Sequence, residues 1–437
     1  MSRRALVLGG SIAGLLAARA LADHVEEVVI VERDDVVGVR GVRKGVPQGS
    51  HVHGLLARGQ QSLEDYFPGF TEEARAAGVP TADLGELRWF FNGKRLAPAT
   101  TGLTCVSADR PVLEHLIRER VRAVPNVTLR EGEEVSSLAF DDAGRTVLGA
   151  MVAPRGTDRC TMVQADVVVD ALGRGSPVAR WLHDAGYDRP EEETVKIDLS
   201  YTSRHYEFDD ESVLRGDMSI NPVSCPQFPR GAFFSRVQDG GSLVSLTGVM
   251  GDHPTTDEAG FMAWARSMEV PDVHEVMAAG RPVDDPVQFR FPKSIRRRFD
   301  RMSDFPAHLL IVGDAMCSFN PVYGQGMTVA ALESELIGRL ASEGEISGEE
   351  YFARAAELLD GPWAASTGGD FAFLGTELPA EVQEANAFIA QVQEAAAHDP
   401  VVTRAFMRVT GLVDPPGTLA SDEIAERVLA PNPMGMS

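Results

Sequence analysis

The chain has 437 residues, 44% of them hydrophobic and 24% charged, which is ordinary for a globular protein and predicts two intimately joined domains. Its formal net charge of −23 argues against nucleic acid or an anionic membrane surface as a partner. The four cysteines (Cys105, Cys160, Cys225 and Cys317) are widely spaced, so we expect reduced thiols in the cytoplasm and no metal site or disulfide framework. No apolar run reaches the roughly 18 residues of a transmembrane helix.

The first patterned segment reads as the start of a dinucleotide-binding βαβ unit. An apolar strand over Ala5–Leu8 leads into Gly9-Gly10-Ser11-Ile12-Ala13-Gly14, a helix follows, and a second strand, Val28–Glu32, ends in an acid. Glycines let backbone amides approach a pyrophosphate, the helix N-terminus favours its charge, and the acid can accept ribose hydroxyls. Ser11 replaces the middle glycine of G-x-G-x-x-G but is small enough to keep the turn.

The same segment also has the features of an export signal. Met1-Ser2-Arg3-Arg4, an apolar run and Ala20-Leu21-Ala22 resemble a cleavable, even twin-arginine, signal peptide. However, Arg19 interrupts the apolar run, and the glycines fall where a phosphate-binding turn needs them. We therefore favour the nucleotide-binding interpretation.

Between residues 38 and 190 the pattern predicts a loop, two helices and several strands. The glycine-rich loop spans residues 38–50. Helices are expected over 55–66 and 111–124, the second opening with Pro111 after Ser107-Ala108-Asp109-Arg110. Strands are expected at residues 87–96, which we assign to a second, substrate-side sheet, and at 127–129, 135–140, 147–153 and 160–169.

Residues 194–291 change to alternating patterns, which predict an antiparallel sheet. Its strands are expected at residues 196–206, 231–236, 242–249 and 287–291, with a helix near 258–268. Residues 309–312 return to the first sheet, a helix covers 327–340, and the rest of the chain is mostly helical.

A second glycine turn lies about 300 residues after the first. The strand ends at Gly313-Asp314, a loop passes Pro321, and Gly324-Gln325-Gly326 opens the helix. An aspartate at a strand end can accept hydroxyl protons from a polyol, and glycines let the backbone approach a flat ring edge. A reduced flavin carries negative charge near its N1–C2=O edge, which a helix N-terminus favours. Together, the two turns predict one flavin site.

These segments resemble the single-component (group A) FAD-dependent monooxygenase superfamily, typified by p-hydroxybenzoate hydroxylase and squalene epoxidase. The superfamily's G-D-A…P…G-Q-G stands here as Gly313-Asp314-Ala315, Pro321 and Gly324-Gln325-Gly326. A third motif, Asp170-Ala171-Leu172-Gly173, departs from the hydroxylase D-G and is closer to epoxidases, halogenases and isoprenoid reductases. The wording of residues 48–53 and 318–326 is similar to bacterial epoxidases of polyether biosynthesis.

The resemblance implies an FAD site. Its implied cofactor-binding residues are Gly9, Ser11, Ile12, Ala13, Gly14, Glu32, Arg33, Arg110, Asp170, Asp314, Pro321, Gly324, Gly326 and Met327. Arg110 would reach the phosphate or ribityl side, Asp314 the ribityl chain, and Gly326 with Met327 the pyrimidine edge. No catalytic or metal-binding residue is predicted, although His51, His53 and Gly326 are candidate neighbours of the flavin ring.

Purely structural alternatives stay open for several of these residues. Arg110 would then pair with Asp109 or cap a carbonyl, and Asp170 would only fix the turn ahead of Arg174. The two histidines would only pack or form hydrogen bonds beside the ring.

The resemblance also implies an α/β fold, α+β overall. A Rossmann-like FAD-binding domain would comprise residues 1–85, 105–190 and 295–345. An inserted antiparallel-sheet substrate domain would comprise residues 86–104 and 191–294, and a C-terminal helical region residues 346–437.

The activity implied by the resemblance is monooxygenation. NADPH or NADH, bound transiently, would reduce FAD, and O2 would add at the flavin C4a position. The resulting hydroperoxide would oxidise a small apolar, electron-rich secondary metabolite. Epoxidation of an alkene is slightly favoured, because no base for deprotonating a phenol is evident.

An aromatic hydroxylase and a flavin-dependent alkene reductase remain alternatives, and a non-enzymatic flavin-binding sensor is least favoured. A halogenase is disfavoured because the W-x-W-x-I-P segment is missing. The sequence indicates neither the substrate's identity nor the oligomeric state.

Overall fold

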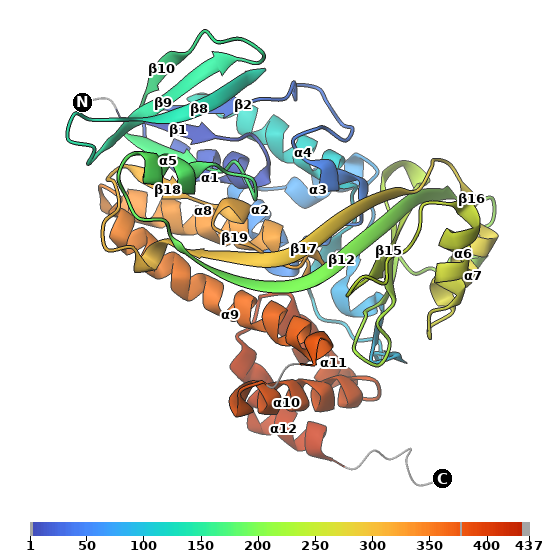
Figure 1. The fold of residues 1–437 in the computed structure, drawn as a ribbon. Coiled ribbons are helices and arrows are strands. Elements are labelled where there is room, and N and C mark those ends of the chain that lie inside the picture. Colours follow the sequence, from blue (N-terminus) through green and yellow to red (C-terminus); the bar gives the residue numbers. More distant parts are fainter. Residues whose placement is uncertain (1–2, 376–377, 431–437) are drawn as a thin grey trace, which may run out of the picture.

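A parallel sheet forms the first layer of the structure, a computed structural model that describes residues 3–375 and 378–430 (Figure 1). Its strand order is β18 (Leu309–Ile311), β11 (Val167–Asp170), β1 (Arg4–Leu8), β2 (Glu27–Glu32) and β7 (Val127–Glu131). Every neighbouring pair is parallel. Except in β7, the side chains are almost all buried, as in parallel strands covered on both faces.

Helices cover one face of this sheet, and a small antiparallel sheet covers the other (Figure 1). The helices of this layer are α1 (Ile12–Ala22), α4 (Arg110–Arg122) and α8 (Gly326–Glu343). The small sheet consists of β8 (Glu133–Phe140), β9 (Val147–Pro154) and β10 (Thr161–Gln164). Nearly all of α1 is buried, which explains why its apolar run also resembles an export signal. The first two residues of that supposed signal, Met1 and Ser2, lie outside the described residues.

The prediction of one strand over residues 160–169 is wrong. The segment divides into β10, which is antiparallel to β9, and β11, which is parallel to β1. The break falls at Ala165–Asp166, where the Asp166 carboxylate accepts a hydrogen bond from the Arg4 amide (2.8 Å). This contact turns the chain into the parallel sheet, and the apolar pattern alone did not reveal it.

The second large sheet is antiparallel over most of its width, as predicted. Its order is β19-β17-β12-β15-β14-β13-β4-β5, with β16 on β12, and only β13 and β4 pair in parallel. The strands are β4 (Arg88–Phe91), β5 (Lys94–Arg95), β12 (Glu191–Glu207), β13 (Ser219–Pro222), β14 (Gly231–Arg236), β15 (Ser242–Gly248), β16 (Arg281–Pro282), β17 (Val287–Arg298) and β19 (Cys317–Ser318). The long strands β12 and β17 run together from this sheet towards the parallel sheet (Figure 1).

Two strand predictions for this sheet need correction. The expected strand at residues 87–96 is a hairpin, β4 and β5, because Asn92 and Gly93 adopt positive φ (50° and 73°) in the turn. The strand expected at residues 287–291 continues to Arg298. Pro292 lies opposite a register shift between Lys196 and Leu199, so its missing N–H does not end the pairing. The predicted domain boundary at residues 294/295 falls inside this strand.

The remaining elements include several that the sequence pattern did not predict, among them α3, α5, α7, β3, β6 and β13. The helices are α2 (Ala57–Tyr66), α3 (Phe70–Ala76), α5 (Val178–Asp184), α6 (Glu258–Arg266) and α7 (Asp272–Ala279), and β3 (Thr81–Asp83) pairs with β6 (Thr104–Val106). The chain then forms α9 (Gly348–Leu374), α10 (Ala380–Ala396), α11 (Pro400–Thr410) and α12 (Asp422–Leu429).

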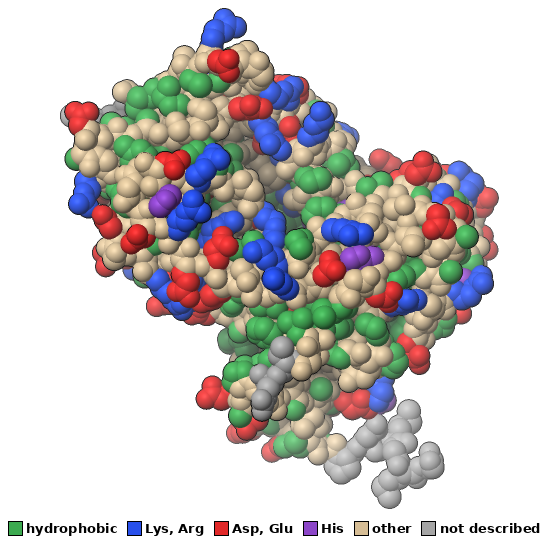
Figure 2. Space-filling model, viewed as in Figure 1, with side chains coloured by type: hydrophobic (Ala, Val, Ile, Leu, Met, Phe, Trp, Pro, Cys, Tyr) green, Lys and Arg blue, Asp and Glu red, His purple; other side chains and the backbone are tan. Residues whose placement is uncertain are grey.

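The long helix α9 contacts both α8 and β12, whereas α10, α11 and α12 form a separate layer below it (Figure 1). Residues 431–437 of the predicted C-terminal region lie outside the described chain. Within the described ranges, no helix combines the length and apolar character needed to span a membrane. Acidic and basic side chains are intermixed over the face shown in Figure 2.

Candidate functional site

The two glycine turns predicted from the sequence meet at one edge of the parallel sheet. Leu8 pairs with both Val31 and Asp170, and Asp170 pairs with Ile311, so four strands end at the same level. A Cβ added to Gly313 would lie 2.9 Å from the Cβ of Ala13. The turns are therefore in contact at the carboxyl ends of the strands, where open α/β sheets bind ligands.

The first turn is too tightly packed for side chains. Gly9 has a φ of +105°, and a Cβ there would lie 2.5 Å from the Ala171 carbonyl oxygen. A Cβ on Gly14 would lie 1.9 Å from the Gly9 carbonyl oxygen. Ser11 stands at the N-cap of α1, but its side chain makes no capping hydrogen bond, so the first amides of this helix remain available to an anion.

Glu32 lies beside this turn and is almost fully buried. Its carboxylate accepts hydrogen bonds from the amides of Gly10 and Asp34, both 2.9 Å long. The guanidinium of Arg43 is 3.3 Å from the same carboxylate. Arg33, by contrast, is exposed and lies 4.0 Å from Asp34, so the structure does not bring it into the cluster.

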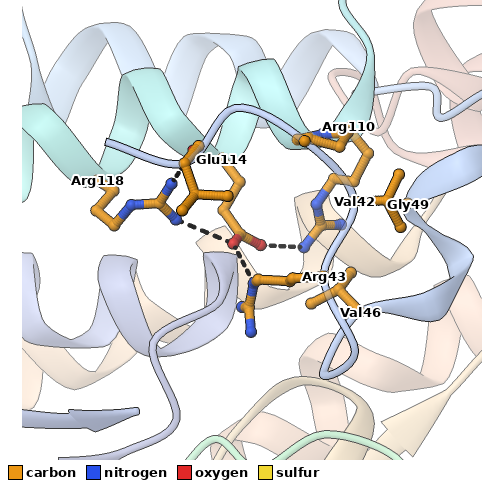
Figure 3. Close-up of a pocket in the computed structure, with 10 residues that line it drawn as sticks. Val42, Arg43, Val46, Gly49, Arg110, Glu114 and Arg118 are labelled. Atoms are coloured by element: carbon orange, nitrogen blue, oxygen red, sulfur yellow. Dashed lines mark hydrogen bonds and ion pairs between the residues drawn. The ribbon is translucent and has the colours of Figure 1, made fainter. Parts of the chain in front are cut away.

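Glu114 of α4 lies between three arginines in a pocket next to the α1 N-terminus (Figure 3). Its carboxylate is 3.0 Å from Arg43, 3.4 Å from Arg110 and 3.1 Å from Arg118. Burial raises the pKa of Glu114, but the neighbouring cations, Arg110 first, hold it below its ordinary value. Ser11 donates a hydrogen bond to this carboxylate (2.7 Å). The pocket thus connects the first glycine turn to α4.

Arg110 is the residue that links the two turns. Its Nη2 donates to Ser11 Oγ (2.9 Å), and its charge acts on Asp314. The structural alternative of an Arg110–Asp109 pair is not found, because Asp109 instead accepts from Gln238 (2.7 Å). Within the described chain, Arg110 Nε and Arg43 Nη2 are buried donors without a hydrogen-bond partner.

Asp314 follows β18 in a short turn and faces the opening of α8. A Cβ on Gly326 would lie 3.8 Å from its Oδ1. Burial raises the pKa of Asp314, and Arg174 and Arg110 oppose that rise. Gly324 has a φ of +65° and lies against the Gly54 carbonyl, so the loop after residue 48 borders this turn. Pro321 begins the preceding 3-10 turn, and Met327 packs in the core.

His51 is buried and His53 partly buried in that loop, and both are neutral at neutral pH. Burial lowers the pKa of His51 to about 4 and that of His53 to about 3, where Arg110 adds to the effect. His51 Nδ1 is hydrogen-bonded to Ser203 (2.7 Å), whereas its Nε2 has no partner in the described chain. Neither imidazole is therefore set up as a cationic proton donor.

The Asp170 carboxylate forms its hydrogen bonds within the turn that follows it. It accepts hydrogen bonds from Ser176 Oγ (2.5 Å) and the Leu172 amide (3.0 Å), and burial raises its pKa to about 6. These contacts agree with the alternative that Asp170 only fixes the turn ahead of Arg174. Ile12 is a core residue at the start of α1.

No family model matches the chain, but related proteins align along most of its length. Protein Rv3254 of Mycobacterium tuberculosis is 32% identical over 447 residues, which covers 98% of this chain and 93% of the relative. The chain belongs to the family of this mycobacterial protein. Digeranylgeranylglycerophospholipid reductase 2 of Methanopyrus kandleri is 27% identical over 385 residues and covers 84% of each chain.

Solved structures show the same fold at low sequence identity. A flavoprotein/dehydrogenase from Cytophaga hutchinsonii has a TM-score of 0.70 at 16% identity, covering 97% of this chain and 96% of its own. The flavin-dependent brominase Bmp2 has a TM-score of 0.67 at 15% identity, covering 93% and 92%. PqsL, a probable FAD-dependent monooxygenase from Pseudomonas aeruginosa, has a TM-score of 0.61 at 17% identity, covering 85% and 98%. The chain thus has the Rossmann-like fold of these flavoproteins.

Two buried acids of the site were not predicted. Glu333 of α8 accepts a hydrogen bond from the Gly313 amide (2.6 Å), and burial, reinforced by the charge of Asp314, raises its pKa to about 8. Its sequence signal was an acid on the apolar face of a predicted helix.

The second of these acids is Asp370 of α9. It accepts a hydrogen bond from Asn320 (2.6 Å), and burial raises its pKa to about 7. Its signal was the pair Gly368-Gly369 inside a helix.

Proposed function

We propose that the chain is an FAD-dependent monooxygenase that uses NADPH or NADH and O2 to oxidise a small apolar, electron-rich substrate. The observation that carries this proposal is the position of Arg110 between Ser11, at the α1 N-terminus, and Asp314, at the second turn. Its unpaired Nε and the unpaired Nη2 of Arg43 are buried cationic donors. A buried donor without a partner is costly, and phosphate oxygens are acceptors that suit such cationic donors.

The residues present fit each part of FAD in turn. The Gly9–Gly14 turn, the α1 N-terminus and the two arginines would hold the diphosphate. Glu32, fixed by two backbone amides, would accept the hydroxyls of the adenosine ribose. Asp314 would accept the ribityl hydroxyls, and the start of α8 at Gly326 would face the pyrimidine edge, where its helix dipole favours negative charge.

When bound and reduced, FAD supplies the electrons and activates dioxygen. The chain contributes orientation and a dry, preorganised environment. The neutral imidazoles of His51 and His53 border the second turn without adding charge. The apolar cluster that contains Tyr201 and Phe291 packs against Val322 of the turn and is the candidate wall of an apolar substrate site.

The relatives and structures support the proposal to different degrees. PqsL is a probable FAD-dependent monooxygenase, which agrees with the proposal, and Bmp2 is a flavin-dependent brominase. The Methanopyrus relative is a reductase of a geranylgeranyl lipid, which favours alkene reduction as the second candidate function. The two activities differ in their need for oxygen, because a monooxygenase transfers an atom of O2 whereas an alkene reductase transfers hydride.

The experiment begins with the absorbance spectrum of the purified protein, which should show bound flavin. NADPH and NADH oxidation is then followed with an oxygen electrode during screens of polyenes and phenols. A monooxygenase consumes O2 in proportion to oxygenated product. A substrate that is reduced under anaerobic conditions would support the reductase instead. Protein that stays colourless after incubation with FAD would contradict both activities.

A further inference from the structure

Asp370 is a buried carboxyl with one oxygen satisfied and the other unpaired. Its side chain lies on α9 and is fully buried. Oδ1 accepts hydrogen bonds from Asn320 Nδ2 (2.6 Å) and from the Tyr323 hydroxyl (3.4 Å). Oδ2 is buried and has no hydrogen-bond partner in the described part of the chain. Burying an unpaired polar atom costs a few kcal/mol, so the second oxygen needs an explanation.

The helix that carries Asp370 is shaped to reach the second glycine turn. A Cβ on Gly369 would lie 2.0 Å from the Tyr323 hydroxyl oxygen, so only glycine permits this approach. A Cβ on Gly368 would be 3.3 Å from Asn386 of α10. Each glycine inside a helix costs about 1 kcal/mol relative to alanine. The two glycines thus permit close contact between α9 and the loop that includes Asn320 and Tyr323, at a cost in helix stability.

The surroundings of Asp370 are aromatic and apolar. Its charge raises the pKa of both Tyr201 and Tyr323, although burial is the larger cause in each. The Tyr201 ring lies 5.9 Å from the His51 imidazole, and Phe289 lies 5.7 Å from the same imidazole. His51 Nε2 is another buried polar atom without a hydrogen-bond partner in the described chain. An apolar cluster is therefore flanked by unsatisfied polar atoms.

Within the described chain, no cation is among the groups that shift the pKa of Asp370. Two tyrosines lie near it, Tyr201 from β12 and Tyr323 from the loop, and its charge raises the pKa of both. From β17 the neutral Ser294 hydroxyl, itself buried and without a partner in the described chain, lies close enough to lower the pKa of Asp370. Such a carboxyl is a base that becomes competent near neutral pH, since its pKa is raised to about 7.

We propose that Asp370 Oδ2 accepts the proton of a substrate hydroxyl, so that the substrate is a phenol or an enol on an apolar ring system. In this step the substrate O–H bond breaks, the proton bonds to Oδ2, and the electron pair stays on the substrate oxygen. The carboxylate becomes a neutral acid held by Asn320 and Tyr323. The resulting anion is electron-rich at the ring carbons, which suits oxygen transfer. This inference rests on the proposed function and specifies its substrate class.

The test compares 2-naphthol with its methyl ether, which lacks the acidic proton. Calorimetric titration of the flavin-loaded wild type should give roughly 10- to 100-fold tighter binding of the naphthol, as expected for a hydrogen bond to a charged group. This preference should rise with pH through about 7, when Asp370 ionises. Asp370→Asn should reduce it to within about threefold, whereas the matched change of the exposed Glu357 on the same helix, Glu357→Gln, should leave it intact.

Two further measurements separate a chemical role from a structural one. The absorbance band of bound naphthol should shift to the red in the wild type, as expected for a hydroxyl that donates to a carboxylate, but not in Asp370→Asn. Tyr323→Phe removes a hydrogen bond that lowers the pKa of Asp370, so the preference should persist but appear at higher pH. This second variant keeps the proposal testable if Asp370→Asn fails to fold.

The wild type's failure to prefer the naphthol, whether both probes bind equally or neither binds, overturns the inference. So does a preference that survives Asp370→Asn, or a pH midpoint that Tyr323→Phe does not move. A protein that binds no flavin instead contradicts the proposed function, so the two failures are distinguishable.

Discussion

Glu333 offers a quantitative test of how the second glycine turn is held. Its pKa rises from an ordinary 4.5 to about 8 because the carboxyl is fully buried on α8 next to Asp314. Ionising it in the folded protein therefore costs roughly 5 kcal/mol, since each tenfold change in acidity is about 1.4 kcal/mol. Below the unfolded pKa both states are protonated, and above it only the unfolded state gains by ionising. Folding stability should consequently fall as the pH rises from 4.5 to about 8.

Glu333→Gln removes this dependence and keeps an oxygen that can accept the Gly313 amide. From about pH 5 to about pH 8.5, the unfolding free energy of the variant should improve relative to wild type by roughly 4 kcal/mol. Urea denaturation at several pH values measures the difference, and the contributions of Asp170 and Asp370, common to both proteins, cancel. Glu343→Gln, an exposed change at the end of the same helix, is the control. Parallel stability curves for wild type and Glu333→Gln would refute the reasoning.

Three other predictions concern the glycine turns and the long strand β12. Gly14→Val should lower the unfolding free energy by at least about 2 kcal/mol, because even a Cβ would lie 1.9 Å from the Gly9 carbonyl oxygen. Thermal or urea unfolding measures the loss, and stability equal to wild type would contradict the close packing of the turn. Asp314→Ala and Glu32→Ala should each weaken FAD binding about tenfold or more in a fluorescence titration, and unchanged affinity in both would overturn the site assignment. His205 lies 3.5 Å from Asp109 and is hydrogen-bonded to Asp284 (2.6 Å), and these carboxylates raise its pKa to about 9. Its stabilising contribution should therefore be lost as the pH rises from 6.5 through about 9. This pH dependence should be absent in His205→Gln, and identical pH profiles would contradict the prediction.

Much of the architecture could be predicted because its signals are local. The strand and the helix that follows it are set by an apolar run and a glycine turn. The strand ends at Leu8 as expected, whereas the helix begins at Ile12, inside the turn that was expected to precede it. The pairing of β1 with β11, and of β11 with β18, depends on contacts between distant segments. The split at Ala165–Asp166 is one such contact, since the Arg4 amide that binds Asp166 is 162 residues away.

The candidate site divides in the same way. Gly9, Gly14 and Gly313 were recognisable because each needs a backbone position that excludes a side chain. Glu333 and Asp370 could not be recognised from the sequence, because a local pattern does not show whether an acid is buried or which residues it contacts. Only the topology places α9 against the loop of Asn320, 50 residues earlier.

The assignment of Asp370 changes the balance between the two oxygenation reactions. One argument for epoxidation, besides the resemblance of two sequence segments to epoxidases, was that no base was evident to deprotonate a phenol. A buried carboxyl whose pKa is raised to about 7, with one free oxygen beside an aromatic cluster, is a candidate for that base. An alkene gives this carboxyl no proton to accept, and the unpaired Oδ2 would then remain a cost without a function. The geometry of α9 therefore favours hydroxylation of a phenol or enol over epoxidation.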